Sequence, residues 1–196
     1  CSSVWPQLRW PRPPFAVPRM TARGLYPRTS PSASRPRGGR RADLMPDFLD
    51  LAFAAAREAA ASGEVPVGAV VVRDGVVLGV AGNRPRALSD PTAHAEILAI
   101  RAACTALQDE RLTGCDLYVT LEPCPMCAGA ISFARIRRLY YAASDPKGGG
   151  VEHGPRVFNQ PTCHHAPEVY SGFRAGEAAG LLREFFAGRR GRDGTP

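Results

Sequence analysis

A histidine and a cysteine pair in this chain have the types and spacing of metal ligands. His94 stands two residues before Glu96, and thirty residues after His94 come Cys124 and Cys127, a C-x-x-C pair that follows Pro123. Zinc at a catalytic centre takes three protein ligands and keeps its fourth tetrahedral position for water. His94, Cys124 and Cys127 therefore predict a catalytic zinc site, with one Zn²⁺ per subunit.

Glu96 is the carboxylate that this pattern leaves without a ligand role. A carboxylate beside a zinc-activated water can move protons between that water and a substrate. We therefore expect Glu96 to be the catalytic proton shuttle of a hydrolytic enzyme. The cysteines could instead form a redox pair or half of a structural zinc site. A structural site needs four protein ligands, and the sequence has no second C-x-x-C or H-x-H to complete one.

The net charge of the chain is concentrated at one end. The 196 residues carry a formal charge of +7, but nine arginines and no acidic residue lie in residues 1–42, which leaves 16 basic and 18 acidic residues for the rest. Nucleic acid would have to bind such a nearly neutral domain through local patches. The longest apolar run, Val65–Val72, is too short to cross a bilayer, so we expect no membrane protein. Six cysteines without a disulfide framework fit a reducing, cytoplasmic setting.

Residues 1–44 differ in composition from the rest of the chain. They are rich in Pro, Arg and Ser and lack apolar periodicity, so we expect a disordered extension before a catalytic domain over residues 45–192. An Arg- and Ser-rich leader also fits a transit peptide, which would direct the protein to an organelle. We favour a start assigned too far upstream, because Met45 stands just before the first predicted helix.

Apolar periodicity predicts an α/β fold. Helices are expected over residues 46–62, 93–107, 125–133 and 176–188, and strands over 67–72, 76–80, 116–120, 136–142 and near 169. Asp74-Gly75 between two β-branched runs predicts a hairpin. His94 would then lie in the first turn of the second helix and the cysteine pair at the start of the third. A glycine-rich loop is expected over 144–160, and the whole order predicts one mixed sheet between helices.

Five stretches of the chain carry a resemblance to a known family. They are GEVPVGAVVVRDG, GNR, DPTAHAEILAIR, RLTGCDLYVTLEPCPMCAGAI and SDPKGGG, which begin at residues 63, 82, 90, 111 and 144. Together they resemble bacterial tRNA-specific adenosine deaminases of the cytidine/deoxycytidylate deaminase superfamily, over about residues 46–190. The H-A-E and P-C-P-M-C elements are shared across that superfamily, whereas D-P-T-A, R-L-T-G-C and D-P-K-G-G favour the tRNA enzymes. The resemblance implies a cytidine-deaminase-like three-layer α/β/α sandwich with a mixed central sheet.

The resemblance also implies residues that bind the target base. The activity would be hydrolytic deamination of the wobble adenosine to inosine in a tRNA anticodon loop. Asn83 would hydrogen-bond the base through its amide, with the backbone N–H of Ala95 as a second contact, and Val65 and Pro66 would wall the pocket. A turn at Asn83 and a buried strand start at Val65 are the structural alternatives.

Asp145 and Lys147 match the loop that holds nucleotides flanking the target in that family. A solvated D-P-K turn is the alternative for these two residues. The implied partners are a tRNA anticodon stem-loop and a second copy of the chain in a homodimer. Residues 148–172 depart from the commoner family pattern and contain Cys163-His164-His165. Adjacent residues cannot easily converge on one ion, so we expect this trio to line the RNA path or a subunit contact rather than a second metal.

Two other functions stay open on the sequence alone. A deaminase of free guanine, cytosine or a nucleotide would share the fold but would not need the SDPKGGG loop. A catalytically silent zinc-binding partner subunit would be marked by loss of the shuttle glutamate, whereas Glu96 is present. We therefore expect an enzyme, a zinc-dependent tRNA adenosine deaminase that hydrolyses a carbon–nitrogen bond.

Overall fold

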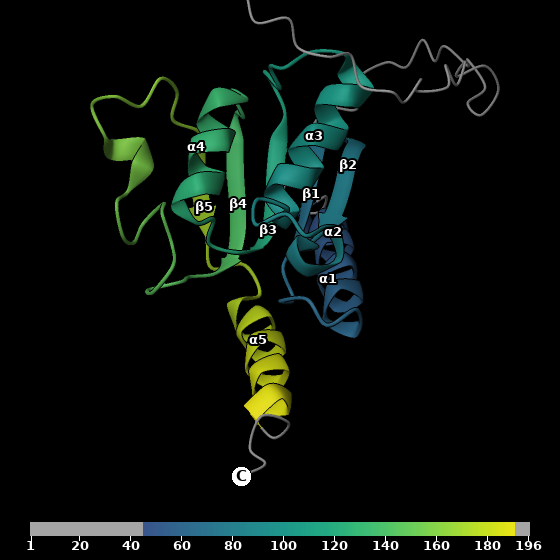
Figure 1. Cartoon of the computed structure of the whole chain (residues 1–196). Coiled ribbons are helices and arrows are strands. Elements are labelled where there is room, and N and C mark those ends of the chain that lie inside the picture. Colours follow the sequence, from purple (N-terminus) through teal and green to yellow (C-terminus); the bar gives the residue numbers. More distant parts are fainter. Residues whose placement is uncertain (1–44, 191–196) are drawn as a thin grey trace, which may run out of the picture. The chain divides into compact units, whose positions relative to one another are not determined.

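The computed structural model describes residues 45–190 (Figure 1). The predicted extension over residues 1–44 lies outside the described residues, as do residues 191–196. The division of the chain into an extension and a domain over residues 45–192 therefore stays a prediction.

Five strands form one mixed sheet. They are β1 (Gly68–Arg73), β2 (Val76–Gly82), β3 (Asp116–Leu121), β4 (Arg138–Ala143) and β5 (Glu168–Ser171). Their order in the sheet is β2-β1-β3-β4-β5. β1 pairs antiparallel with β2 and β3, whereas the pairs β3–β4 and β4–β5 are parallel. The sheet therefore has an antiparallel half, built around a hairpin, and a parallel half.

Helices cover both faces of this sheet, as the three-layer α/β/α prediction requires. They are α1 (Met45–Ala61), α2 (Pro85–Leu88), α3 (Ala95–Leu107), α4 (Pro125–Phe133) and α5 (Ala175–Arg190), with a 3₁₀ turn η2 (Val157–Asn159). α3 and α4 lie side by side in front of the sheet in Figure 1, whereas α1 lies behind it. Among the described residues no helix is both long and apolar enough to span a bilayer.

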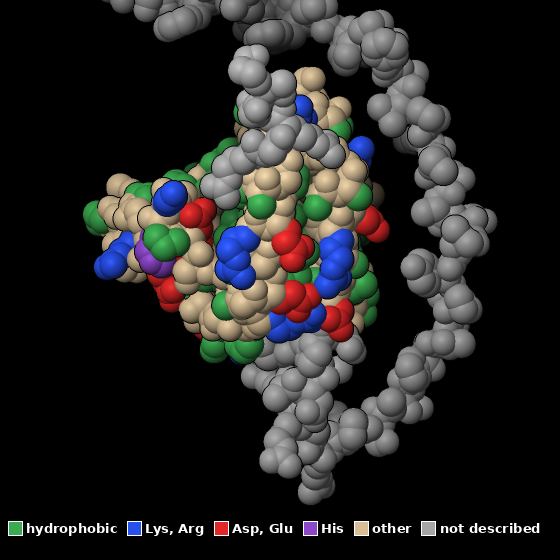
Figure 2. Space-filling model, turned by 90° about the horizontal axis from the view of Figure 1, so that it is seen from below, with side chains coloured by type: hydrophobic (Ala, Val, Ile, Leu, Met, Phe, Trp, Pro, Cys, Tyr) green, Lys and Arg blue, Asp and Glu red, His purple; other side chains and the backbone are tan. Residues whose placement is uncertain are grey.

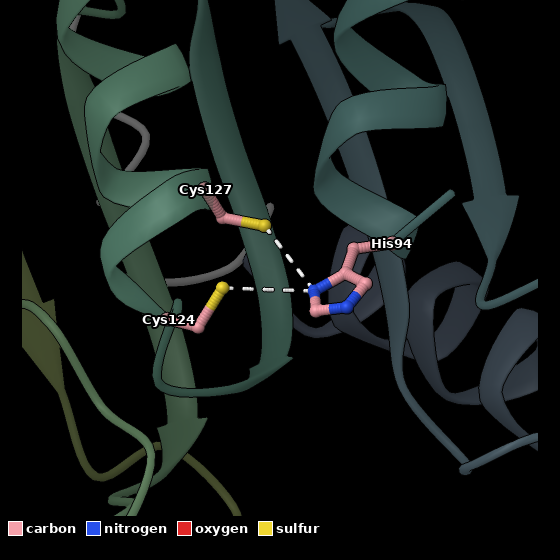
Figure 3. Close-up of side chains that lie close together, drawn as sticks. All are labelled: His94, Cys124 and Cys127. Atoms are coloured by element: carbon pink, nitrogen blue, oxygen red, sulfur yellow. Dashed lines mark hydrogen bonds between the residues drawn. The ribbon is translucent and has the colours of Figure 1, made fainter. Parts of the chain in front are cut away.

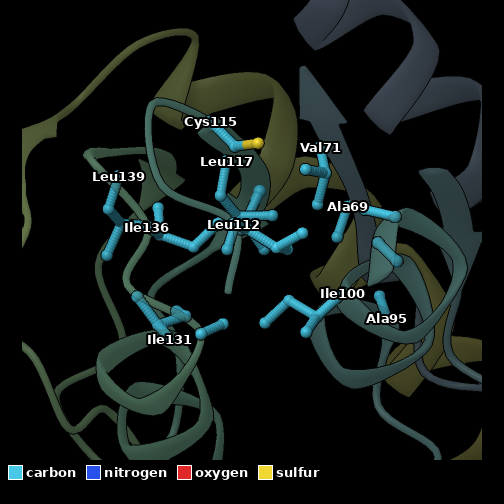
Figure 4. Close-up of a cluster of buried hydrophobic side chains, with 14 of the residues drawn as sticks. Ala69, Val71, Ala95, Ile100, Leu112, Cys115, Leu117, Ile131, Ile136 and Leu139 are labelled. Atoms are coloured by element: carbon cyan, nitrogen blue, oxygen red, sulfur yellow. The ribbon is translucent and has the colours of Figure 1, made fainter. Parts of the chain in front are cut away.

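Two apolar clusters hold the layers together. On the face of α3 and α4, Ile100 and Ile131 pack with Leu117 and its neighbours on the sheet (Figure 4). On the other face, Phe53 of α1 lies in a cluster with Tyr118 and with residues of α5. Each fully buried aliphatic or Phe side chain stabilises the fold by about 1.5–3 kcal/mol. The first cluster matters most for function, because it fixes the two helices whose N-terminal ends carry the predicted zinc ligands.

The predicted elements are confirmed, with two differences near the predicted site. The turn at Asp74-Gly75 joins β1 to β2, and both residues adopt positive φ (51° and 82°), as a type I′ hairpin turn requires. His94, predicted in the first turn of a helix, precedes α3 and has an extended backbone (φ −72°, ψ 152°). The short helix α2, which opens with Pro85, was not predicted, because one turn is too short to give an apolar period.

Candidate metal centre

The three predicted zinc ligands meet at the N-terminal ends of α3 and α4 (Figure 3). Their ligand atoms form the one group of His, Cys, Asp or Glu found within residues 45–190 that could hold a metal ion. Nδ1 of His94 lies 3.6 Å from the sulfur of Cys124 and 3.6 Å from that of Cys127. His94 and Cys124 directly precede their helices, and Cys127 lies in the first turn of α4.

These distances fit zinc. A tetrahedral Zn²⁺ with Zn–N and Zn–S bonds of about 2.0 and 2.3 Å holds its nitrogen and sulfur ligands about 3.5 Å apart. The observed Nδ1–Sγ distances of 3.6 Å match that value. One nitrogen and two sulfurs leave one tetrahedral position for a fourth, non-protein ligand. The three residues therefore fit a Zn²⁺ ion, which they would hold with one coordination position left for water or substrate.

Hydrogen bonds within the trio shift the pKa values of all three side chains. The bond with Cys127 lowers the pKa of Cys124 to about 4. The same bond, together with burial, raises the pKa of the Cys127 thiol. The bond with Cys124 also raises the pKa of His94. Zinc requires thiolates and a neutral imidazole, so the raised pKa values of Cys127 and His94 oppose zinc binding as the pH falls.

Glu96 lies beside the trio but outside it. It belongs to the first turn of α3, is 3% exposed, and contacts the thiol of Cys127. Burial raises the pKa of its carboxyl to about 7. A carboxyl with a pKa close to the working pH can both accept and donate a proton. This placement suits the predicted shuttle, and the role itself stays a prediction.

Asn83 and Ala95, the two predicted base contacts, are hydrogen-bonded to each other. Asn83 follows β2 and is 7% exposed. Its Oδ1 accepts the N–H of Ala95 at 2.8 Å, and its own N–H donates to the carbonyl of Val67 at 3.0 Å. The side-chain NH₂ is then the part of Asn83 that can donate to a base. Val65 and Pro66, the predicted pocket wall, directly precede Val67 and are half-buried and buried.

A cavity of about 480 Å³ lies next to this site, between α1, β2 and α2. Asn83 and Arg84 line it, together with the buried Glu64, whose Oε1 accepts the N–H of Ala87 at 2.8 Å. None of the three ligand residues lines it. The cavity is therefore a neighbour of the metal centre and not the place where a base would react.

Asp145 and Lys147 lie in the loop after β4, and Asp145 organises the turn there. Oδ1 of Asp145 accepts the N–H groups of Lys147 and Gly148, both at 3.0 Å. Such bonds are expected if Asp145 serves only to form the D-P-K turn, which was the alternative to an RNA contact. The side chain of Lys147 is exposed and forms no ion pair within residues 45–190, so its charge is available to a ligand.

Glu122 is a residue whose importance the sequence did not reveal. It follows β3 directly, its side chain is completely buried, and it binds the loop that contains Asp145. Glu122 belongs to the stretch that begins at residue 111, but no pattern in the sequence predicted a role for it. An acidic residue between a buried strand and a metal ligand is the signal that could have found it.

Cys163 and His165 anchor the long loop after β4. Sγ of Cys163 lies 3.4 Å from Oγ of Ser132 in α4, and Nε2 of His165 donates to the carbonyl of Ile136 at 2.6 Å. His164 is the exposed member of the trio. None of the three belongs to the group of possible metal ligands found among the described residues.

Comparison with known sequences gives a consistent result. Residues 44–143 match the family model for the cytidine and deoxycytidylate deaminase zinc-binding region. A tRNA-specific adenosine deaminase of Agrobacterium fabrum is 64% identical over 143 residues, which are 73% of this chain and 94% of that protein. One of Aquifex aeolicus is 45% identical over 71% of this chain and 91% of its own length.

Comparison with solved structures gives the same fold. A structure from a study of A-to-I editing by tRNA:A34 deaminases at the wobble position has a TM-score of 0.69 and 64% identity, and covers 70% of this chain and 99% of its own. A guanine deaminase from Nitrosomonas europaea has a TM-score of 0.62 and 25% identity, and covers 71% of this chain and 83% of its own.

Proposed function

This chain belongs to the zinc-binding cytidine and deoxycytidylate deaminase family, and from that membership we infer that it converts the wobble adenosine of a tRNA anticodon to inosine. The identity of 64% to a tRNA-specific adenosine deaminase, over 94% of that relative, carries this conclusion. The guanine deaminase shares the fold at 25% identity. Free-base deamination is therefore the less supported function.

The reaction replaces the exocyclic amine of adenine by oxygen from water and releases ammonia. Zinc, when bound by His94, Cys124 and Cys127, acts as a Lewis acid that lowers the pKa of water toward about 7. We assign to Glu96 the proton transfers. Its carboxylate accepts a proton from the attacking water and donates it to ring N1 as the oxygen adds to C6. It then carries the remaining proton of the added hydroxyl to the exocyclic amine, whose bond to C6 breaks as ammonia leaves. The burial that raises the pKa of Glu96 to about 7 supports both directions of transfer.

Asn83 is the residue that we assign to recognition of the base. Its Oδ1 is held by the N–H of Ala95, so its NH₂ group is oriented as a donor, which suits a ring nitrogen of adenine. The predicted contact from Ala95 would then act through Asn83. The hydrogen bond between Asn83 and Ala95 fixes the position of the Asn83 NH₂ group relative to His94, because His94 directly precedes Ala95 in the chain.

We propose that the RNA is bound by a few individual side chains and backbone groups rather than by a broad basic surface. Figure 2 shows acidic and basic side chains side by side on the visible face, with no continuous basic patch. Protein recognition of single-stranded RNA loops commonly relies on splayed bases, stacking and individual contacts. We propose that Lys147 and the turn organised by Asp145 contact nucleotides that flank the target, which the exposure of Lys147 supports.

A homodimer is the assembly that we propose. Phe133 and Met126 on α4 are 71% and 37% exposed, and Phe133 also lines a cavity of about 220 Å³ together with His164. Exposed apolar groups gathered on one helix are typical of protein contacts. Sedimentation should show a dimer, and Phe133→Glu should shift it toward monomer. A fully active monomer would refute the assembly.

We propose the cytoplasm as the place of action. The substrate, tRNA, supports this choice. The five cysteines among the described residues are free, which suits a reducing compartment. Fractionation of cells that express the full chain would test the assignment.

The function is tested by offering zinc-loaded protein two kinds of substrate. One is an anticodon stem-loop with adenosine at the wobble position, and the other is a set of free adenine, guanine and cytosine. We expect inosine and equimolar ammonia from the stem-loop only. A stem-loop with guanosine at that position is the matched control. Turnover of a free base at a comparable rate would overturn the tRNA assignment.

A further inference from the structure

Glu122 is a buried acid at the junction between β3 and the cysteine pair. Its side chain is 0% exposed, and Pro123 alone separates it from Cys124. A carboxylate removed from water is strongly destabilised unless hydrogen bonds or charges compensate. Its partners therefore show what this residue is for.

All the hydrogen-bond partners of the Glu122 carboxylate lie in residues 145–153, named here the Glu122 loop. Oε1 accepts the backbone N–H groups of Val151, Glu152 and His153 at 3.2, 2.9 and 2.9 Å. Oε2 accepts the N–H of Asp145 at 3.0 Å and bonds Nδ1 of His153 at 2.7 Å. Four backbone amides and one imidazole thus converge on a single carboxylate, and hydrogen bonds to an ionised acceptor are about twice as strong as neutral ones.

Two glycines bring the same loop against the ligand segment. A Cβ on Gly149 would lie 2.5 Å from the carboxyl carbon of Glu122, and one on Gly150 would lie 2.6 Å from the nitrogen of Pro125. The N–H of Gly150 donates to the carbonyl of Pro123 at 2.8 Å. The Glu122 loop therefore contacts the backbone on both sides of Cys124.

We propose that Glu122 is a positioning residue for the RNA substrate: it fixes the Glu122 loop, with Asp145 and Lys147, at a set distance from the zinc ligands. This inference rests on the proposed function, because it gives the loop its RNA role. Glu122 itself touches neither substrate nor metal. It keeps the loop residues that contact the flanking nucleotides at a constant position relative to the zinc ligands.

Glu122→Gln tests the proposal with little change in shape. The amide keeps one acceptor oxygen but points an NH₂ group at donors, so the loop loses its anchor. We expect KM for the stem-loop to rise about 10- to 100-fold, kcat to change little and zinc content to stay near one. Hydrogen exchange at the four bonded amides should speed up. Asp116→Asn, which removes the carboxylate paired with Arg137 at the other end of β3, should change neither exchange nor KM.

Gly149→Ala breaks the same contact without a change of charge, and it keeps the test open if Glu122→Gln fails to fold. We expect the same rise in KM and the same faster exchange. Zinc lost in step with activity would mean that Glu122 supports the metal instead, and unchanged KM with unchanged exchange would also overturn the proposal. If the parent protein deaminates no stem-loop, the proposed function fails. Even then, hydrogen exchange of the loop amides that is as slow in Glu122→Gln as in the parent protein would contradict the claim that Glu122 fixes the loop.

Discussion

The metal centre and the Glu122 loop meet at Cys124 but are built in opposite ways. At the metal centre three side chains converge at the N-terminal ends of two helices, with Nδ1 3.6 Å from each sulfur. In the Glu122 loop one side chain is central, and four of its partners are backbone amides. The first arrangement depends on residue types and the second on the path of the chain. We expect substitutions in the two regions to separate chemistry from RNA binding.

Removal of a ligand should have the largest effect. In Cys124→Ala the trio loses a thiolate, so we expect zinc to fall from near one per chain to near zero and deamination to fall below detection. Metal analysis of the purified protein measures the first and inosine formation the second. Cys104→Ala, which removes a free thiol of α3, should keep both. Full zinc in Cys124→Ala would contradict the ligand assignment.

Replacement of the shuttle should leave the metal in place. Glu96→Gln removes the proton acceptor and replaces none of the three ligands, so we expect kcat to fall by about 10²- to 10⁴-fold, with zinc content and stem-loop binding unchanged. Single-turnover kinetics and a binding assay separate these quantities. A variant within tenfold of the parent rate would show that another group moves the proton.

The pH dependence of zinc affinity is a further test of the metal centre. Hydrogen bonds with Cys124 raise the pKa values of Cys127 and His94, which favours the protonated forms that compete with zinc. Affinity should therefore rise with pH, by about tenfold per unit for each displaced proton while that group is protonated. Competition with a chelator between pH 5 and 8 measures it. An affinity independent of pH would mean that the ligands are already deprotonated.

The smallest effect is expected at the exposed lysine of the loop. Lys147→Ala removes one cation from the RNA contact, so we expect a rise of a few-fold in KM and a salt dependence weaker by about 0.7 in log–log slope, with kcat unchanged. Arg111→Ala, an exposed cation paired with Glu110, is the control. Equal effects of the two variants would mean that only overall charge matters.

The sequence predicted the parts whose signal lies in side-chain types. The hairpin follows from Asp74-Gly75, the helices and strands from apolar spacing, and the ligands from a C-x-x-C with an H-x-E. Each of these patterns is local and has few alternatives. The prediction that His94 lies in the first turn of its helix was wrong, because a turn held by Asp90 and Thr92 precedes the helix, which begins at Ala95 and not at residue 93.

The parts that the sequence missed depend on backbone partners far along the chain. Glu122 binds amides more than twenty residues away, and nothing in the types of those residues marks them as donors to a carboxylate. His165 likewise binds the carbonyl of Ile136, twenty-nine residues away, and the run Cys163-His164-His165 gave no sign of that contact. Such bonds are specified by the route of the chain and not by a motif.

The pairing of Asn83 with Ala95 also has a consequence for helix capping. Ser, Thr, Asp or Asn usually stands directly before a helix and accepts one of its first N–H groups, and loss of such a cap costs about 0.5–2 kcal/mol. His94 and Cys124 occupy these cap positions and make no capping bond. α4 begins with Pro125, which has no N–H to satisfy, whereas the first N–H of α3 is capped from a distance by Asn83. Replacement of Asn83 by Ala should therefore lower the melting temperature as well as base binding, and its turnover must be compared at equal folded fraction.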